Sequence, residues 1–239
     1  MIFSLNNENL GYDGCAVLRD ISVTISAGER VALVGESGSG KTTLLSVLQT
    51  RYDENTALIP QNLGLVRSLS VFHNIYMGAL ARNNTAYNLS NLVWPRKREV
   101  AQIRPIAEGL GLGDKLFERV GTLSGGQQQR VFLARALAQD STIYFMDEPF
   151  ASVDAATEKA IVQVLADLRS NGKTVIVVHH DLQTVTEYFD HVIMLNMRVV
   201  AHGPVEEVFT DENLKKTYGG RLTLLSEATD RLAKHKVVG

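Results

Sequence analysis

One stretch of eight residues constrains this chain more than any other: Gly35-Glu36-Ser37-Gly38-Ser39-Gly40-Lys41-Thr42. It has the G-x-x-x-x-G-K-T pattern of a phosphate-binding loop. The apolar run 31–34 predicts a buried strand leading into the loop, and residues 43–48 predict a helix leading out of it, which is the context that the pattern requires. Backbone N–H groups at such a helix start bind phosphate, so the stretch predicts a nucleotide site. The alternative is a glycine-rich turn with a fortuitous lysine, and the flanking elements disfavour it.

The composition is that of a globular protein without a nucleic-acid footprint. The 239 residues suffice for one large α/β domain or two small ones. With 24 Lys+Arg against 26 Asp+Glu, the net charge is −2, which disfavours a dedicated DNA or RNA binder. A local basic patch, Arg96-Lys97-Arg98, fits a contact with a membrane surface or partner, but we expect a solvated helix start.

The single cysteine and the apolar runs bear on the compartment. Cys15 has no partner for an internal disulfide, which fits a reducing, cytosolic environment. The N-terminal residues do not have the pattern of a signal peptide. No run approaches the roughly 20 apolar residues needed to span a bilayer. If this protein works at a membrane, we expect another chain to supply the spanning part.

The chain alternates strand and helix patterns around the loop. Residues 1–34 predict short β segments with turns, one of which carries Tyr12, either a base-stacking ring or a surface aromatic. Residues 56–60 predict a strand, and Gln61 follows it. The alternation over residues 31–200 predicts a mostly parallel sheet.

The middle of the chain has a helical pattern. Apolar residues at helical spacing begin near Leu69 and continue through residues 100–110. Leu69, Val71, Phe72, Ile75, Tyr76 and Leu80 are expected on one face. The asparagine-rich insert 82–91, followed by Trp94-Pro95, is expected to lack regular structure. We therefore predict a helical subdomain over about residues 65–138.

Two further motifs stand at the ends of predicted elements. Ser124 is a good N-cap for a helix through residue 137, and the glycines after it leave amides exposed, so this is a second anion-binding helix start. The strand 142–146 runs into Asp147-Glu148-Pro149, which places two carboxylates where ligands of parallel sheets bind.

The last third contributes histidines and a tail. The strand 174–178 ends in His179-His180-Asp181, and adjacent strand residues point to opposite faces, so a zinc site is disfavoured and one histidine at the sheet edge is expected. A hairpin over residues 192–201 and a polar helix from Val205 follow. Residues 221–239 fit either a docking helix or a frayed end.

Taken in order, these motifs resemble the nucleotide-binding subunits of ABC transporters over about residues 1–220. The motifs are the phosphate loop, Gln61, Leu123-Ser124-Gly125-Gly126-Gln127, Asp147-Glu148-Pro149, Ser152-Val153-Asp154 and His180-Asp181. The resemblance implies an α/β P-loop NTPase with a mostly parallel sheet flanked by helices, N-terminal antiparallel β elements and a helical subdomain. It implies one ATPase domain over 1–220 and a tail over 221–239.

The resemblance also implies residue roles. Tyr12 would stack on adenine, and the residues that would bind ATP phosphates are Gly35, Ser37, Gly38, Ser39, Gly40, Lys41, Thr42 and Thr43. Thr42, Gln61 and Asp147 would organise Mg²⁺. Glu148 would be the general base, assisted by His180, Gln61 and Lys41. Ser124, Gly125, Gly126 and Gln127 would bind the γ-phosphate of ATP held by a second subunit in a head-to-tail dimer.

Two features depart from the family pattern. Only 19 residues separate Lys41 from Gln61, so we expect part of the antiparallel arm after the first helix to be missing. The middle segment 69–80 is similar to phosphonate-importer ATPases, whereas residues 178–220 resemble those of manganese and zinc importers. The two halves disagree about cargo.

We therefore expect an ATP-hydrolysing importer subunit with ATP and Mg²⁺ as cofactors, at the cytoplasmic face of the membrane. Its expected partners are a second copy or a paralogous ATPase, permease chains and, indirectly, a solute-binding protein, with no nucleic acid. One alternative is a soluble ABC-type ATPase acting on nucleic acid or ribosomes. Another is a P-loop kinase, for which the sequence offers no acceptor-binding lid.

Overall fold

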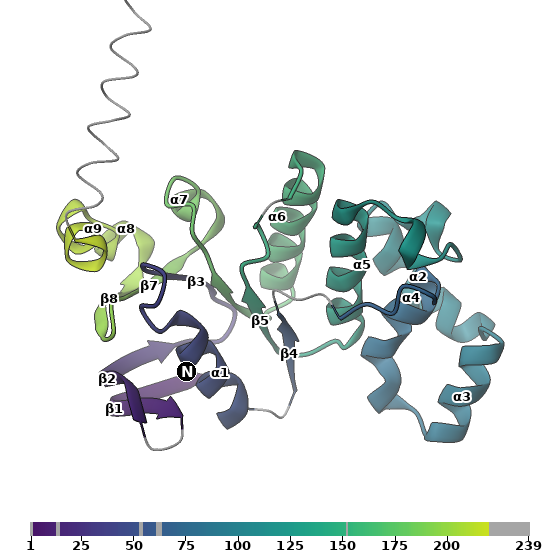
Figure 1. Cartoon of the computed structure of the whole chain (residues 1–239), viewed down its shortest axis with the longest axis horizontal. Helices are drawn as coiled ribbons and strands as arrows, with labels where there is room; N and C mark the ends of the chain where they lie inside the picture. Colours follow the sequence, from purple (N-terminus) through teal and green to yellow (C-terminus); the bar gives the residue numbers. More distant parts are fainter. Residues whose placement is uncertain (1, 13–14, 53–54, 61–63, 152, 220–239) are drawn as a thin grey trace, which may run out of the picture. The chain divides into compact units, whose positions relative to one another are not determined.

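The computed structural model describes residues 2–12, 15–52, 55–60, 64–151 and 153–219 (Figure 1). The chain forms two compact units. Unit 1 comprises residues 1–51 and 178–239, and unit 2 comprises residues 52–177. None of the helices in these ranges has the length and apolar composition needed to span a bilayer.

The elements of each unit follow in chain order. Those of unit 1 are β1 (Phe3–Tyr12), β2 (Cys15–Ile25), β3 (Arg30–Val34), α1 (Lys41–Arg51), α7 (Val185–Tyr188), β7 (His191–Leu195), β8 (Val199–Pro204), α8 (Val205–Val208) and α9 (Asp211–Tyr218). Those of unit 2 are β4 (Thr56–Ile59), α2 (Val71–Tyr76), the 3₁₀ helix η1 (Met77–Arg82), α3 (Thr85–Val93), α4 (Lys97–Gly109), η2 (Gly113–Lys115), η3 (Val120–Thr122), α5 (Gly125–Ala138), β5 (Ile143–Asp147), α6 (Ala155–Ser170) and β6 (Thr174–Val178).

Unit 1 is built from two sheet parts and α1. β1 and β2 form an antiparallel hairpin, and α1 packs against it. β3 pairs in parallel with β7, with Val34 opposite Met194, and β7 pairs antiparallel with β8. The apolar residues of β3 and β7 are buried, as expected for strands covered on both faces.

Unit 2 combines parallel strands with a helical part. β4 pairs in parallel with β5, from Thr56 opposite Ile143 to Ile59 opposite Met146. α2, η1 and α4 pack against α5. Gly78 of η1 comes so close to α5 that a Cβ would overlap the carbonyl oxygen of Arg135. Glycine at this position therefore sets the spacing of the two helices.

The predicted fold class is confirmed. Six strands make up a mostly parallel sheet, with the order β4-β5-β6 in unit 2 and β3-β7-β8 in unit 1. The hairpin of β1 and β2 supplies the predicted antiparallel N-terminal part. Helices α2 to α5 supply the predicted helical subdomain. The proposed domain boundary at residue 220 lies at the end of the described residues and stays a prediction.

The insert 82–91 was expected to lack regular structure, and that expectation is wrong. Most of the insert is helical, because residues 85–91 belong to α3. Its asparagines have structural tasks that a composition argument misses. Asn84 caps α3 by accepting a hydrogen bond from the Tyr87 backbone N–H (2.9 Å). Asn91 is fully buried inside unit 2. Leu80, expected on the buried face, is 39% exposed.

Asn74 holds the segment before α2 in place. It is fully buried, and its Oδ1 accepts from the Val66 N–H (2.9 Å). Its Nδ2 donates to the carbonyl oxygens of Val66 (3.0 Å) and Ser70 (3.0 Å). The side chain thus gives the Val66 N–H an acceptor and adds a second donor to two carbonyl oxygens that already accept from the Leu69 and Asn74 backbone N–H groups.

Replacing Asn74 with Ala should lower the free energy of unfolding by about 2–3 kcal/mol, because three hydrogen bonds of a fully buried side chain are lost and the Val66 N–H loses its acceptor. Chemical denaturation measures this change. Asn6→Ala is the matched control, since Asn6 is exposed and makes one long hydrogen bond to Ser4 (3.4 Å). We expect that control to stay within about 0.5 kcal/mol of the parent. Equal effects of the two substitutions would contradict the role given to Asn74.

Candidate functional site

The phosphate loop lies in unit 1 between β3 and α1. Gly38 (φ 81°) and Gly40 (φ 97°) adopt left-handed backbone conformations that other residues rarely adopt. A Cβ on Gly40 would overlap the side chain of Leu18 from β2. The loop therefore needs glycine at position 40 for both its conformation and its packing.

Gly35 makes the tightest approach in the loop. A Cβ there would overlap the carbonyl oxygen of Leu195, the last residue of β7, and would lie 2.6 Å from Ser39 Oγ. The carbonyl belongs to a paired strand and cannot move away. The glycine thus lets the loop fold back onto the end of the neighbouring strand.

The loop presents donors suited to an anion. The Lys41 side chain is buried, and its Nζ donates to the carbonyl oxygens of Gly35 (2.9 Å) and Glu36 (2.8 Å). In the described part of the chain, the buried Ser39 Oγ has no hydrogen-bond partner. A buried ammonium and a buried hydroxyl in a glycine loop at a helix start fit a phosphate group.

Two residues that contact the loop, Met197 and Tyr218, were not predicted from the sequence. The Met197 N–H, in the β7–β8 turn, donates to the Ser39 carbonyl (3.0 Å), and the Met197 carbonyl accepts from the Arg19 N–H (3.1 Å). Tyr218, the last residue of α9, places its hydroxyl against the Gly35 backbone. Burial raises the pKa of Tyr218 to about 12, and the Glu36 carboxylate adds to that rise while the nearby Gly35 backbone opposes it. By distance and angle, the Tyr218 hydroxyl makes no hydrogen bond among the described residues. No local pattern signals contacts across so many residues.

The second helix start, at α5 in unit 2, has the predicted cap. Ser124 Oγ accepts from the Gln127 N–H (3.3 Å), and Gln127 Oε1 accepts from the Ser124 N–H (3.0 Å). This capping box satisfies two of the backbone donors at the helix start. Gly125 is exposed, and a Cβ there would meet nothing within 4 Å. The Gly125 end of the helix is therefore open to an incoming anion.

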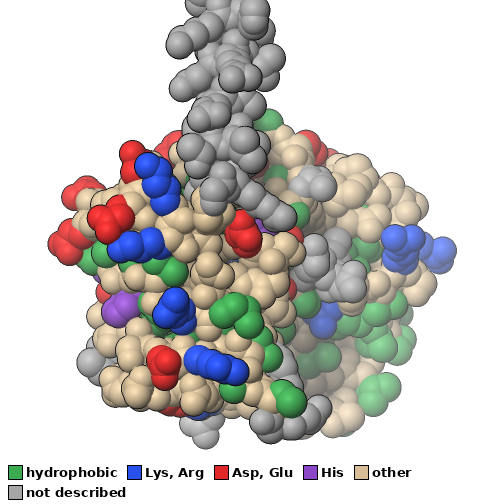
Figure 2. All heavy atoms as spheres, turned by 60° about the vertical axis from the view of Figure 1, so that its left-hand side comes forward, with side chains coloured by type: hydrophobic (Ala, Val, Ile, Leu, Met, Phe, Trp, Pro, Cys, Tyr) green, Lys and Arg blue, Asp and Glu red, His purple; other side chains and the backbone are tan. Residues whose placement is uncertain are grey.

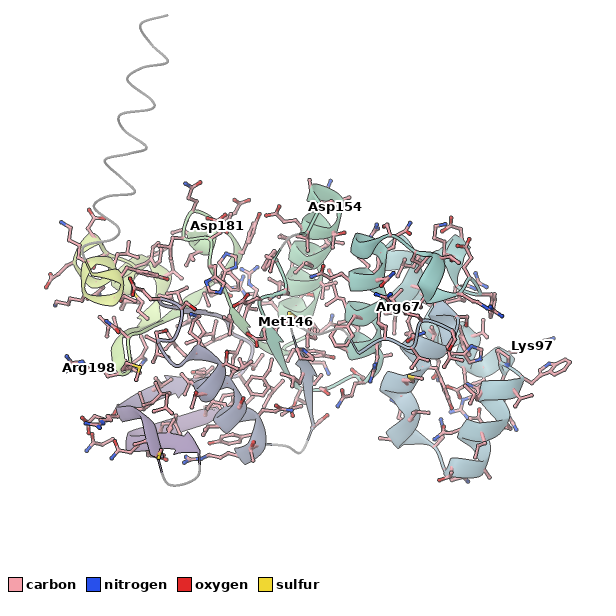
Figure 3. The ribbon with its side chains drawn as sticks, viewed as in Figure 1. Arg67, Lys97, Met146, Asp154, Asp181 and Arg198 are labelled. Atoms are coloured by element: carbon pink, nitrogen blue, oxygen red, sulfur yellow. The ribbon has the colours of Figure 1, made fainter. Side chains whose placement is uncertain are left out.

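α5 is fixed to the segments that follow β5. Gln129 Nε2 donates to the Pro149 carbonyl (2.9 Å). A Cβ on Gly126 would lie 2.7 Å from Asp154 Oδ2, at the start of α6 (Figure 3). Asp154 caps α6 through the Thr157 N–H (2.7 Å), and that hydrogen bond lowers the pKa of the Asp154 carboxyl. Unit 2 therefore brings the second helix start and the acidic segment together.

The acidic pair stands at the carboxyl end of β5, as predicted. Asp147 is the last residue of β5, and Glu148 follows with φ 53°, a left-handed conformation that is rare for a residue with a side chain. Asp147 and Glu148 line a small cavity of about 20 Å³. Gln129, Arg130 and Thr157 are among the other residues that line it. Strained backbone of this kind concentrates at functional sites.

The two adjacent histidines separate as expected. His179 is buried, and its Nε2 lies 2.8 Å from Thr184 Oγ1. His180 is exposed at the end of β6. Among the described residues, no group of three or more His, Cys, Asp or Glu side chains could hold a metal ion.

The predicted site residues thus fall into two sets. Unit 1 carries the phosphate loop and His180, and unit 2 carries Asp147, Glu148 and the start of α5. Tyr12 ends β1. Gln61 lies outside the described residues.

Comparison with known proteins identifies the family. Residues 18–151, more than half of the chain, match the family described as ABC transporter. The chain belongs to the ABC transporter ATPases. It is similar to the manganese transport system ATP-binding protein MntB of Bacillus subtilis, with 40% identity over 93% of this chain and 94% of MntB. It is also similar to the zinc transport system ATP-binding protein TroB of Treponema pallidum, with 43% identity over 92% of this chain and 87% of TroB.

Solved ATP-binding cassettes share the fold of this ABC transporter ATPase. One is an ABC transporter cassette in its ADP conformation, with a TM-score of 0.71, 26% identity and coverage of 90% of this chain and 97% of that one. Another is a nucleotide-free cassette, with a TM-score of 0.69, 23% identity and coverage of 89% and 92%. The MntB alignment runs over 246 positions, more than the 239 residues of this chain, so MntB has residues that this chain lacks. The shortening expected after the first helix stays a prediction.

Gly35→Ala should lower the affinity of this ATPase for ATP by about a hundredfold, because the new Cβ overlaps the fixed Leu195 carbonyl oxygen. Gly38→Ala is the matched control, because its Cβ has open space and only the left-handed conformation is penalised. We expect that control to lose about tenfold or less. Titration with a fluorescent ATP analogue measures both, and thermal unfolding checks that both variants fold. A larger loss in the Gly38 variant would contradict the packing argument.

Proposed function

We propose that this ABC transporter ATPase powers an importer for a transition-metal ion, manganese or zinc. The observation that carries the proposal is the likeness to MntB and TroB, each of which this chain matches over most of its length. Their names are those of manganese and zinc transport systems. Neither of these two relatives is named for phosphonate, so we abandon the phosphonate alternative. The same names favour transport over action on nucleic acid or ribosomes.

The phosphate loop is the proposed site of ATP. Residues 35 and 37–43 would surround the phosphates, with Lys41 turning from the Gly35 and Glu36 carbonyls toward them. The Ser39 hydroxyl would gain the partner that it lacks among the described residues. Tyr12 would stack on the adenine.

Thr42, Asp147 and Gln61 would hold Mg²⁺, whose charge offsets that of the phosphates. Glu148, which directly follows the last residue of β5, would take the proton from the attacking water. His180, exposed at the end of β6, would donate a hydrogen bond to the γ-phosphate. Phosphoryl transfer needs mainly such positioning and charge neutralisation.

The start of α5 would complete the site of a second copy. Its capping box pairs Ser124 with Gln127, and Gly125 next to the cap is exposed. A γ-phosphate is the kind of anion that such a helix start binds. ATP would thus hold two copies, or one copy and a paralogue, head to tail.

The expected partners follow from this role. The described residues include no membrane-spanning helix, and we propose that separate permease chains form the pathway. The ATPase would bind them at the cytoplasmic face of the membrane. A solute-binding protein would deliver the metal ion from the other side.

Glu148→Gln should retain ATP affinity while its turnover falls by about a hundredfold or more, because the amide cannot accept the proton of the attacking water. ATP should then trap a dimer that size-exclusion chromatography resolves. Phosphate release and nucleotide titration separate the two effects.

Lys41→Ala provides the contrast, since it should weaken ATP binding itself. Asp167→Asn, which changes an exposed carboxylate of α6, is the neutral control. Unchanged turnover of the Glu148 variant would remove Glu148 from the role of base.

The cargo requires the assembled transporter. With its permease and solute-binding protein in lipid vesicles, the complex should show ATP hydrolysis stimulated by Mn²⁺ or Zn²⁺ and not by a phosphonate. The Glu148→Gln complex is the control for background hydrolysis. Stimulation by the phosphonate alone would overturn the metal assignment and leave the ATPase assignment intact.

A further inference from the structure

Helix α3 packs with its polar side toward the rest of unit 2. The Tyr76 hydroxyl donates to Asn88 Oδ1 (2.7 Å), and Asn88 Nδ2 donates to the Leu80 carbonyl (2.9 Å). The fully buried Asn91 accepts from the Arg96 N–H (2.8 Å) through Oδ1. Hydrogen bonds rather than apolar contacts hold these positions of the helix.

The apolar side of α3 is consequently exposed. Leu89 (59% exposed), Leu92 (45%) and Val93 (78%) occupy neighbouring positions on one face, spaced by three and four residues. Trp94 follows directly and is 80% exposed. An amphipathic surface helix normally buries this face, so its exposure indicates an external binding partner.

Three consecutive cations continue this surface. Arg96, Lys97 and Arg98 are exposed at the start of α4, and Lys97 lies at the outer edge of the helical part of unit 2 (Figure 3). Arg96 stacks over the Tyr87 ring at 4.4 Å. The next carboxylate, Glu99, is buried and accepts from the Tyr87 hydroxyl (2.9 Å). It therefore does not offset the positive charge at the surface.

This combination matches one kind of partner better than others. Tryptophan is enriched where protein meets the boundary of a bilayer, with its apolar ring below the polar headgroups. Leucine and valine beside it add apolar area, and adjacent Lys and Arg side chains are attracted to anionic headgroups. An apolar groove on a protein would cover the side chains of Leu89 and Leu92 but would offer no negative charge to the three cations.

We propose that the α3–α4 surface, formed by Leu89, Leu92, Val93, Trp94, Arg96, Lys97 and Arg98, binds the anionic surface of a lipid bilayer. The apolar side chains enter the headgroup boundary, and the cations contact lipid phosphates. The binding requires neither a transported metal nor an ATP-held dimer. It gives the ATPase an affinity for the membrane that is independent of the permease.

The surface carries its own reporter, because Trp94 is the only tryptophan of the chain. The purified full chain is titrated with vesicles of phosphatidylglycerol mixed with phosphatidylcholine. We expect the Trp94 emission to shift to shorter wavelength and to become protected from acrylamide. Pure phosphatidylcholine should give a much weaker effect, and added salt should reverse the shift, because headgroup charge drives the binding.

Variants separate the contributions of charge and apolar area. Lys97→Glu with Arg98→Glu should lower the partition into anionic vesicles by about thirtyfold or more. Leu92→Ser with Val93→Ser should lower it by about tenfold or more. Lys159→Glu changes an exposed lysine of α6 in the same unit and should reduce the partition far less. ATP hydrolysis should be unchanged in all of these variants.

The proposal is overturned if anionic vesicles leave the Trp94 emission unchanged, or if the Lys159 variant loses as much affinity as the Lys97–Arg98 variant. An emission shift that appears only with a vesicle-free, detergent-solubilised permease would assign the surface to a protein partner instead. None of these outcomes bears on the ATPase assignment, which hydrolysis measures separately.

Discussion

The close contact between Gly35 and the Leu195 carbonyl oxygen is the constraint on which the nucleotide loop depends. Parallel pairing of β3 with β7 brings Val34 and Met194 opposite each other, so the next residues of both strands meet at the sheet edge. Only glycine can fold back at that point. Further along the loop, the Met197 N–H donates a hydrogen bond to the Ser39 carbonyl. The buried Tyr218 side chain lies against the start of the loop, near Gly35 and Glu36. A loop encoded near the N-terminus thus receives its shape from strands and a helix encoded some 160 to 180 residues later.

The parts that sequence reasoning recovered are those with strong local signals. Gly38, Gly40 and Lys41 identify the loop because backbone conformation and phosphate charge leave few alternatives at those positions. Ser124 predicts an N-cap from its residue type and position, and the structure has that cap, with Gln127 completing a capping box. The strand that ends at Asp147 is readable from its uninterrupted apolar run. The alternation of strands and helices predicted the mostly parallel sheet, and the resemblance to a family implied the rest of the fold class.

Other features depend on contacts between distant segments, which no single window of sequence contains. Gly126 looks like an ordinary helix-start glycine until Asp154 is seen 2.7 Å from the place of its Cβ. Tyr218 reads as one aromatic in a polar helix, and its neighbour Gly35 is far away in sequence. The asparagines of the insert suggested a loop because asparagine favours turns, yet Asn84, Asn88 and Asn91 cap and anchor α3. These partners lie only 3 to 12 residues away, so here the signal was local and the composition argument overlooked it.

The hydrogen bonds of Asn88 and Asn91 explain why the apolar face of α3 remains exposed to solvent. On the face of the molecule drawn in Figure 2, hydrophobic side chains are interspersed with charged ones. If burial of Leu89 and Leu92 held α3 in place, the helix would have to turn around its axis and withdraw Asn91 from its buried site. That would leave the Arg96 N–H without its acceptor and separate Tyr87 from Glu99. Buried polar groups without partners cost more than exposed leucines. The polar anchoring therefore fixes the direction of the apolar face, and the cations at the start of α4 decide the charge of the surface that can cover it.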